Sequence, residues 1–148
     1  MSFFKEYKNR LNKLINAIDE SVIEEVISSL ESTNKNNSRI YIIGNGGSSA
    51  TASHMMNDFG VGLRRRDIRN FDVWSLGDNS AVITAAANDV GFDGIFKLQL
   101  RGHLQENDVL IAISCSGNSS NIIKAVEYAK EIGATVIGLT GFDGGLLK

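Results

Sequence analysis

Apolar residues recur every three or four positions over the N-terminal third of the chain, residues 4–30. This spacing places them on one stripe of a helix, so the pattern predicts a helical segment. Ser21 followed by Glu24 fits a capping box, in which the two side chains satisfy backbone N–H groups at a helix start. We therefore expect two helices with a break near residues 19–21.

The pattern changes after a polar run at residues 32–38, which we interpret as a connector. Short apolar runs then alternate with segments of helical periodicity, which predicts βαβ units with right-handed crossovers and a parallel sheet. The last two apolar runs are hydrophobic enough for strands buried on both faces. The expected strands are Arg39–Ile43, Phe71–Leu76, Asp108–Ile113 and Thr135–Leu139, and the expected helices are Ser49–Phe59, Ser80–Asn88, Gly94–Leu104 and Ser120–Ile132.

Composition narrows the class of protein. With 43% hydrophobic and 22% charged residues in 148, the chain has the balance of one ordinary globular domain. Fifteen Lys and Arg against 17 Asp and Glu give a net charge of −2, so we expect no direct nucleic-acid binding. No apolar run approaches the length of a membrane span, and we expect no membrane partner. One cysteine and no signal peptide predict a cytoplasmic protein.

The chain has 15 glycines and no proline, and the glycines gather in loops that follow expected strands. The three loops are residues 44–49, 114–120 and 141–145. In parallel α/β sheets, ligands bind at the carboxyl ends of the strands, where such loops lead into helices. These loops therefore locate the candidate binding site.

The loop at residues 114–120 contains four serines and opens onto an expected helix. Its hydroxyls, its backbone N–H groups and the positive end of the helix dipole suit a phosphate group. The alternative is that these serines are ordinary cap and turn residues. No lysine follows as in a nucleoside-triphosphate P-loop. Cys115 in this loop has serines on both sides; it is either a reactive thiol or a small side chain filling a turn.

The loop at residues 44–49 approaches the dinucleotide-binding pattern G-x-G-x-x-G, but Ser49 stands at the last glycine position. The acidic residue of that pattern, about 20 positions on, is replaced by Arg64. Nicotinamide binding is therefore a minor alternative. The glycines do allow a ligand to approach the backbone beside Ser48.

Two further pairs of residues are candidates for metal or substrate binding. His54 and Asp58 are four residues apart on an expected helix, so they share one face and can hold a metal or a sugar hydroxyl together; the alternative is a surface ion pair. A metal would need at least one more ligand. Asn88 and Asp89 either contact a sugar hydroxyl or form a C-terminal helix turn.

Taken in order, the motifs resemble the sugar isomerase (SIS) domain, and more narrowly the phosphoheptose isomerase family. The resemblance covers residues 39–148 and implies a flavodoxin-like or Rossmann-like three-layer α/β/α sandwich with a parallel sheet. It also implies a homotetramer with active sites between subunits, in which residues 1–38 contribute to oligomerisation. The motifs are Gly44-Asn45-Gly46-Gly47-Ser48, His54, Asn88-Asp89, Ser114-Cys115-Ser116-Gly117-Asn118-Ser119 and Gly138-Leu139-Thr140-Gly141-Phe142-Asp143-Gly144-Gly145.

The resemblance implies a phosphosugar substrate and isomerisation of sedoheptulose 7-phosphate to D-glycero-D-manno-heptose 7-phosphate in bacterial lipopolysaccharide or capsule biosynthesis. His54 and Asp58 match zinc ligands, and Asp58 matches the base that moves a proton between C1 and C2 through an enediol. The residues implied to hold phosphate are Ser114, Cys115, Ser116 and Ser119, and those implied to contact the rest of the substrate are Asn45, Gly46, Gly47, Ser48, Asn88 and Asp89.

The chain departs from the family pattern in two ways. The family usually has a glutamate where Asp58 stands, and a misplacement of about 1 Å can cost on the order of 10²-fold in rate. The family also continues through a further strand and helix that carry a glutamine and a histidine of the zinc site, and we expect this chain to lack both elements. Two non-catalytic alternatives stay open: a SIS-domain protein that binds the replication initiator, and a phosphosugar-sensing module.

Overall fold

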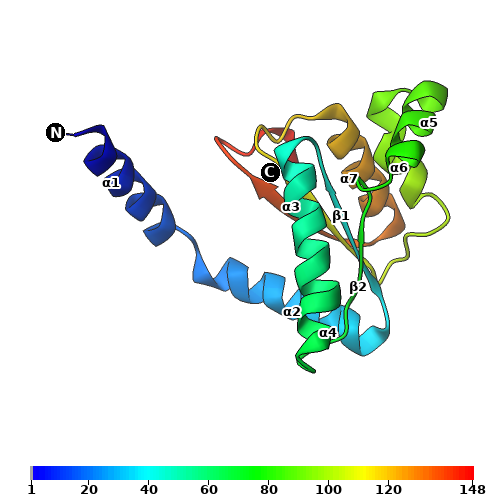
Figure 1. The fold of residues 1–148 in the computed structure, drawn as a ribbon, viewed down its shortest axis with the longest axis horizontal. Helices are drawn as coiled ribbons and strands as arrows, with labels where there is room; N and C mark the ends of the chain where they lie inside the picture. Colours follow the sequence, from blue (N-terminus) through cyan, green and yellow to red (C-terminus); the bar gives the residue numbers. More distant parts are fainter. Residues whose placement is uncertain (1) are drawn as a thin grey trace.

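The computed structural model describes residues 2–148, which form an α/β body with two N-terminal helices extending from it (Figure 1). The strands are β1 (Arg39–Gly44), β2 (Asp72–Ser75), β3 (Val109–Ser114) and β4 (Thr135–Thr140). The helices are α1 (Phe3–Asn16), α2 (Glu20–Asn36), α3 (Gly47–Met56), α4 (Leu63–Arg65), α5 (Ser80–Val90), α6 (Ile95–Leu100) and α7 (Ser120–Ile132), with a π-helical turn η1 (Asn57–Gly62) and 3₁₀ turns η2 (Phe92–Gly94) and η3 (Gly145–Leu147).

The four strands form one parallel sheet in the order β2-β1-β3-β4. Alternate side chains of β1 point to opposite faces, as the two-residue period of a strand requires. Ile40 and Ile42 pack against α3 and the end of α2, whereas Tyr41 and Ile43 pack against α5, α6 and α7. The expected three-layer α/β/α sandwich with a parallel sheet is therefore confirmed.

The β3 strand is buried on both faces, but the same expectation for β4 is wrong. β4 pairs with β3 alone among the strands of residues 2–148, and Leu139 near its carboxyl end is exposed. The sequence of a strand shows only that its side chains are apolar. The position of a strand in the sheet is set by which neighbours the chain supplies.

Two expectations for the N-terminal third are corrected. The N-cap of α2 is Asp19 and not the expected capping box of Ser21 and Glu24. Asp19 Oδ1 accepts hydrogen bonds from the Ser21 N–H at 2.9 Å and from the Ser21 hydroxyl at 2.7 Å. The polar run at residues 32–38 was expected to be a connector, but α2 continues through it to Asn36. The helix ends at Asn37, which has a left-handed conformation (φ 53°). Thr33 in this last turn is buried, so tertiary packing extends a helix through polar residues.

The remaining elements match the expected ones to within a few residues. α7 begins and ends where the periodicity places it, and α3 starts two residues earlier than expected. α6 is shorter than the expected helix at residues 94–104. Within residues 2–148, no helix combines the length and the apolar character that crossing a membrane requires.

Candidate active site

The topology places the two serine- and glycine-containing loops side by side. α3, which follows β1, packs on one face of the sheet, whereas α7, which follows β3, packs on the other. Because β1 and β3 are neighbours, their following loops separate to opposite faces and leave a crevice at the carboxyl ends of the two strands. The N-termini of both helices begin at this crevice.

The loop after β1 is built around glycine. Gly46 has φ 53° and ψ −120°, a conformation that glycine adopts most readily, and a Cβ on Gly46 or Gly47 would meet no other atom within 4 Å. At Gly44 a Cβ would lie 2.7 Å from the backbone of Ser48, so the turn closes tightly on itself. The loop therefore offers open backbone at Gly46 and Gly47 above a rigid base.

The loop after β3 brings its serine hydroxyls together. The Ser114 hydroxyl donates to the Ser119 hydroxyl at 3.3 Å, and the Ser116 hydroxyl accepts from the Asn118 N–H at 3.2 Å. Ser119 is the N-cap of α7, and the N–H groups of Ser120 and Asn121 that follow it have no carbonyl one turn earlier in the helix. Hydroxyls and helix N–H groups converge here, which suits an anionic oxygen group.

The loop after β4 is fastened to the loop after β3. The Gly141 N–H donates to the Cys115 carbonyl at 3.0 Å, and the Leu147 N–H donates to the Gly117 carbonyl at 3.1 Å. Phe142 in this third loop has φ 50° and is 95% exposed. The fastening holds Phe142 at the rim of the crevice.

These loops enclose a cleft of about 560 Å³. Every loop residue predicted from the sequence at positions 45–48 and 114–119 as a substrate contact lines it, except Gly46. Thr51 and Ile113 also line it, although sequence reasoning missed them, and so does Phe142, which lies in the third predicted loop but was given no role. Its lining residues are Asn45, Gly47, Ser48, Thr51, Ile113, Ser114, Cys115, Ser116, Ser119 and Phe142.

One contact between the loops carries no signal in the sequence. The Asn45 side-chain amide donates to Asn121 Oδ1 at 2.9 Å, and the Asn121 amide donates back to Asn45 Oδ1 at 2.8 Å. Asn121 is 1% exposed, in the first turn of α7. An asparagine at this helical position resembles any other cap-region residue, so only the tertiary structure identifies its partner.

His54 and Asp58 are close together, as their spacing predicts. Their Nε2 and Oδ2 atoms are 3.2 Å apart, and the side chains are 77% and 57% exposed. Neither lines the cleft in this chain. Among residues 2–148, no group of three or more His, Cys, Asp or Glu side chains could hold a metal ion. Two donors fall short of the three protein ligands of a catalytic zinc site, so this pair alone does not fit a complete zinc centre.

Asn88 and Asp89 also lie away from the cleft between the loops. The Asn88 amide donates to Asp89 Oδ1 at 2.9 Å, at the exposed C-terminal end of α5. Asp89 lines a separate, largely apolar cavity of about 680 Å³, with Tyr41, Trp74 and Leu98 among its walls. Within one chain, the predicted site residues therefore fall into three separate places.

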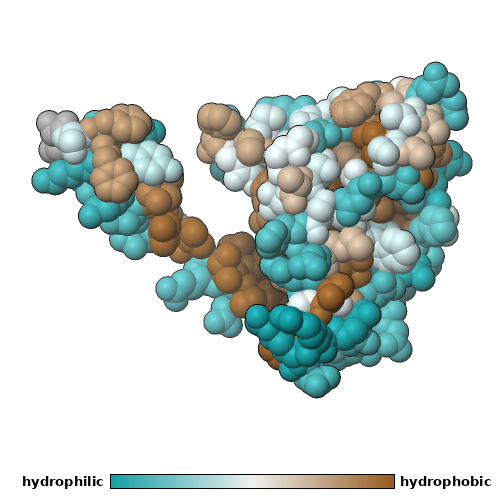
Figure 2. Space-filling model, viewed as in Figure 1, coloured by the Kyte–Doolittle hydropathy of each residue, from teal (hydrophilic) through white to brown (hydrophobic). Residues whose placement is uncertain are grey.

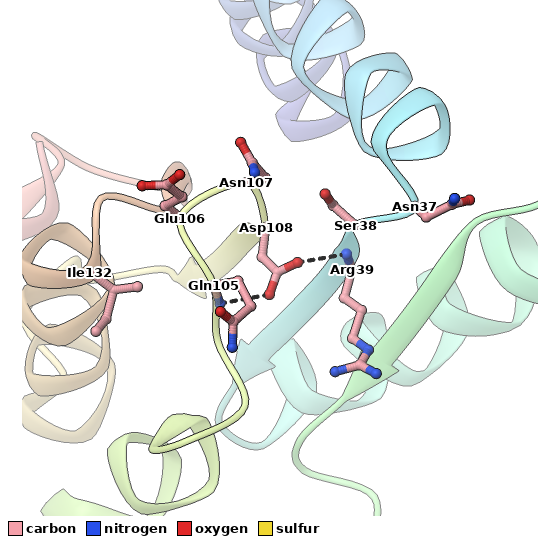
Figure 3. A pocket seen from close by; sticks show the side chains of 8 residues that line it. All are labelled: Asn37, Ser38, Arg39, Gln105, Glu106, Asn107, Asp108 and Ile132. Carbon is pink, nitrogen blue, oxygen red and sulfur yellow. Dashed lines mark hydrogen bonds between the residues drawn. The ribbon is translucent and has the colours of Figure 1, made fainter.

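A further polar cavity lies at the amino ends of the strands (Figure 3). Its central group is Asp108, which is 3% exposed and accepts hydrogen bonds from the backbone N–H groups of Arg39 and Gln105, each at 2.8 Å. This carboxylate joins the start of β1 to the turn before β3. Its hydrogen bonds account for its burial as a structural group.

Comparison with known proteins identifies the family of this chain. The SIS domain family model matches residues 2–141. The phosphoheptose isomerase of Helicobacter pylori strain Shi470 is 37% identical over 98% of this chain and 74% of its own length, and that of Fusobacterium nucleatum is 40% identical over 100% of this chain and 77% of its own length.

Solved structures show the same architecture. A phosphoheptose isomerase from Neisseria gonorrhoeae superposes with a TM-score of 0.83 at 33% identity, over 97% of this chain and 75% of that chain. One from Francisella tularensis superposes with a TM-score of 0.84 at 29% identity, over 99% of this chain and 80% of that chain. The chain therefore belongs to the SIS domain family and, within it, to the phosphoheptose isomerases, which are phosphosugar isomerases.

Proposed function

We propose that this chain interconverts sedoheptulose 7-phosphate and D-glycero-D-manno-heptose 7-phosphate, an aldose–ketose isomerisation that supplies heptose for bacterial lipopolysaccharide or capsule. One observation carries the proposal: a single cleft holds open glycine backbone on one side and clustered serine hydroxyls at a helix N-terminus on the other. The serine side of such a cleft offers a phosphate site and the glycine side offers a sugar site, so one phosphosugar molecule can occupy both. The exposed single thiol, Cys115, is in keeping with a reducing cytoplasm as the place of the reaction.

The phosphate is expected at the loop after β3. Ser114, Ser116 and Ser119 donate hydroxyl hydrogen bonds to its oxygens, and the first turn of α7 adds backbone N–H groups and the positive end of its dipole. The sugar end then lies against Gly47 and Ser48, where no side chain obstructs the backbone. Binding at both ends fixes the carbonyl carbon and its neighbour, which is the requirement for directed proton transfer.

The proton transfer between C1 and C2 needs a base, and Asp58 is our candidate. Its carboxylate lies 3.2 Å from His54 Nε2 and accepts a hydrogen bond from the Asn57 amide at 3.2 Å, so it is held in place on η1. Removing a proton beside a carbonyl also requires stabilisation of the enediolate. His54 and Asp58 would supply two of the ligands of a zinc ion, and with further ligands completing the site such an ion would stabilise the enediolate.

Because Asp58 and Asp89 do not line the cleft of their own chain, we propose a homotetramer in which neighbouring subunits complete each site. The N-terminal helices provide the surface for such an assembly. Figure 2 shows hydrophobic side chains gathered along α1 and the start of α2. Phe3 is 85% exposed, and no residue of α1 is buried. Exposed apolar surface of this extent marks an interaction site. The exposed residues of this apolar stripe are Phe3, Phe4, Tyr7, Leu11, Leu14, Ile15, Ile18, Val22, Ile23 and Ile27.

The assembly is tested by placing charge on the stripe. Leu11→Glu combined with Leu14→Glu is expected to convert the oligomer to monomer in analytical ultracentrifugation, because both side chains are exposed and their loss leaves the α/β core intact. Lys13→Glu, outside the stripe, serves as the control. An unchanged mass for the double variant would reject the stripe as an interface.

The reaction is tested by incubating the protein with sedoheptulose 7-phosphate over a range of zinc concentrations and following the aldose phosphate by NMR. Turnover that falls in Ser116→Ala but not in Ser32→Ala, a serine on exposed α2 surface, supports the proposal. Binding of the sugar phosphate without turnover at any zinc level would favour a phosphosugar sensor instead. An absence of both binding and turnover would reject the proposed substrate.

A further inference from the structure

The reciprocal amide pair between Asn45 and Asn121 joins the loop after β1 to the first turn of α7, which follows the loop after β3. The residues are 76 positions apart in sequence, one directly after β1 and the other in the first turn of α7. Asn121 Oδ1 also accepts from the Ile122 N–H at 3.0 Å. Asn121 is buried and Asn45 is half-buried, so the pair exchanges its two hydrogen bonds with little competition from water.

The pair also uses most of the hydrogen-bonding groups of the Asn45 side chain. An asparagine amide has two N–H donors and one acceptor oxygen, and Asn45 commits one donor and its oxygen to Asn121. Turning the Asn45 amide toward a ligand would break both hydrogen bonds and leave the buried amide of Asn121 without this partner. Leaving a buried polar group without its partner is costly. The geometry therefore favours an Asn45 amide that stays on Asn121 when a ligand binds.

We propose that Asn121 is a positioning residue for the isomerase reaction, and that Asn45 contributes to the reaction mainly through its two hydrogen bonds to Asn121. The inference rests on the proposed function. The amide pair fixes the distance between the loop at residues 45–48, which faces the sugar, and the loop at residues 114–119, which faces the phosphate. A phosphosugar must fit both loops at once, whereas inorganic phosphate needs only the second loop.

The test is a double-mutant cycle with Asn45→Ala, Asn121→Ala and the double variant, using two probes. For sedoheptulose 7-phosphate, each single variant is expected to lower kcat/KM by about 10-fold to 100-fold, in keeping with a misplacement of about 1 Å. The double variant is expected to lose no more than either single variant, because one interaction is removed in all three. The inhibition constant of inorganic phosphate is expected to stay within about 2-fold of the wild-type value.

Two further variants separate positioning from loss of fold. Asn121→Leu keeps a similar side-chain volume, adds no charge and removes both hydrogen bonds to Asn45, so the same loss of kcat/KM is expected from a folded protein. In Asn121→Ala, the Ile122 N–H keeps its bond to the Ser119 carbonyl at 3.0 Å, so the first turn of α7 persists. Asn79→Ala removes the N-cap bond of α5 at a residue that does not line the cleft, and controls for asparagine loss alone.

Each outcome decides the inference. If Asn45→Ala costs much more than Asn121→Ala and the two losses multiply in the double variant, Asn45 contacts the substrate directly and the positioning role is overturned. Equal weakening of inorganic phosphate would overturn it as well, because that result indicates general damage to the phosphate loop. If wild-type protein neither binds nor converts sedoheptulose 7-phosphate, the proposed function fails and the inference fails with it. If the wild type acts and the variants match it, the inference alone fails.

Discussion

The Cα atom of Gly117 lies directly against the carbonyl of Gly144, so that a Cβ on Gly117 would be 1.8 Å from that oxygen. Gly117 also has φ 64°, in the left-handed region. Two loops that are far apart in sequence therefore meet backbone to backbone at the phosphate side of the cleft.

Gly117→Ala is expected to force these loops apart and to abolish phosphate and phosphosugar binding, measured by calorimetry. Gly102→Ala is the matched control, because Gly102 also has positive φ (76°) but no atom lies within 4 Å of its Cβ position. The control is expected to lose only the cost of a left-handed alanine, roughly 1–2 kcal/mol. Equal binding by both variants would show that the loop contact is dispensable.

Gly47→Ala is expected to separate binding from stability. Gly47 begins α3, and its Cβ position is free of other atoms, so alanine is expected to stabilise the fold by about 0.4–1 kcal/mol in chemical denaturation. The new methyl group occupies the sugar side of the cleft and is expected to weaken sedoheptulose 7-phosphate more than inorganic phosphate. Ser80→Ala, at the start of α5, is the control, and identical ligand affinities in the two variants would contradict the assigned orientation of the substrate.

Asp58→Glu is expected to raise kcat for the isomerisation, by up to about 10²-fold, if the shorter carboxylate stands too far from the transferred proton. Asp67→Glu, an exposed turn residue, is the control for the added methylene. Progress curves under saturating substrate provide the measurement. An equal or lower kcat in Asp58→Glu would show that the site is built around the aspartate.

Asp108→Ala is expected to destabilise the protein without affecting the reaction. The substitution leaves the N–H groups of Arg39 and Gln105 without their acceptor, at about 1–3 kcal/mol each. Because Asp108 lies at the amino ends of the strands and the cleft lies at their carboxyl ends, kcat and KM are expected to stay at wild-type values below the melting temperature. Glu106→Ala, exposed beside it, is expected to change stability by less than about 0.5 kcal/mol. A changed KM in Asp108→Ala would mean that the two ends of the sheet are coupled.

The ion pair of Asp93 and Lys124 predicts a specific acid dependence. A hydrogen bond from Lys124 holds the pKa of the Asp93 carboxyl below its usual 3.8. A carboxyl with a lower pKa in the folded state stabilises the fold above its unfolded pKa, and this contribution is lost as the pH falls through the folded pKa. Asp93→Asn is therefore expected to melt at a lower temperature than wild type at neutral pH and to converge with it in acid.

Thermal melts from about pH 7 down to pH 2, at low salt, measure this convergence. The effect is small because the pair is exposed and screened by solvent. Asp67→Asn is the control, because the Asp67 carboxyl forms no ion pair within residues 2–148. Its melting temperature is expected to differ from that of wild type by a constant amount. A constant difference for Asp93→Asn as well would remove the ion pair as the cause.

Local sequence signals determined a large part of this fold. The periodicity at residues 120–132 gave α7 with both ends in place, because an amphipathic stripe and the serine and glycine that flank it all agree. The alternation of apolar runs with helices gave the parallel sheet, since a parallel pair of strands needs a crossover helix. That topology in turn placed Gly44–Ser49 and Ser114–Ser120 at one edge, and hence the cleft.

Tertiary structure alone decided the features that depend on distant partners. The sequence could not show that Thr33 packs into the core and keeps a polar segment helical, nor that β4 lies at the edge of the described sheet. It could not pair Asn45 with Asn121, because a hydrogen bond across 76 residues leaves no local pattern. Periodicity and turn chemistry act over a few residues, so they fix elements and loops, whereas contacts between loops follow from how the whole sheet is assembled.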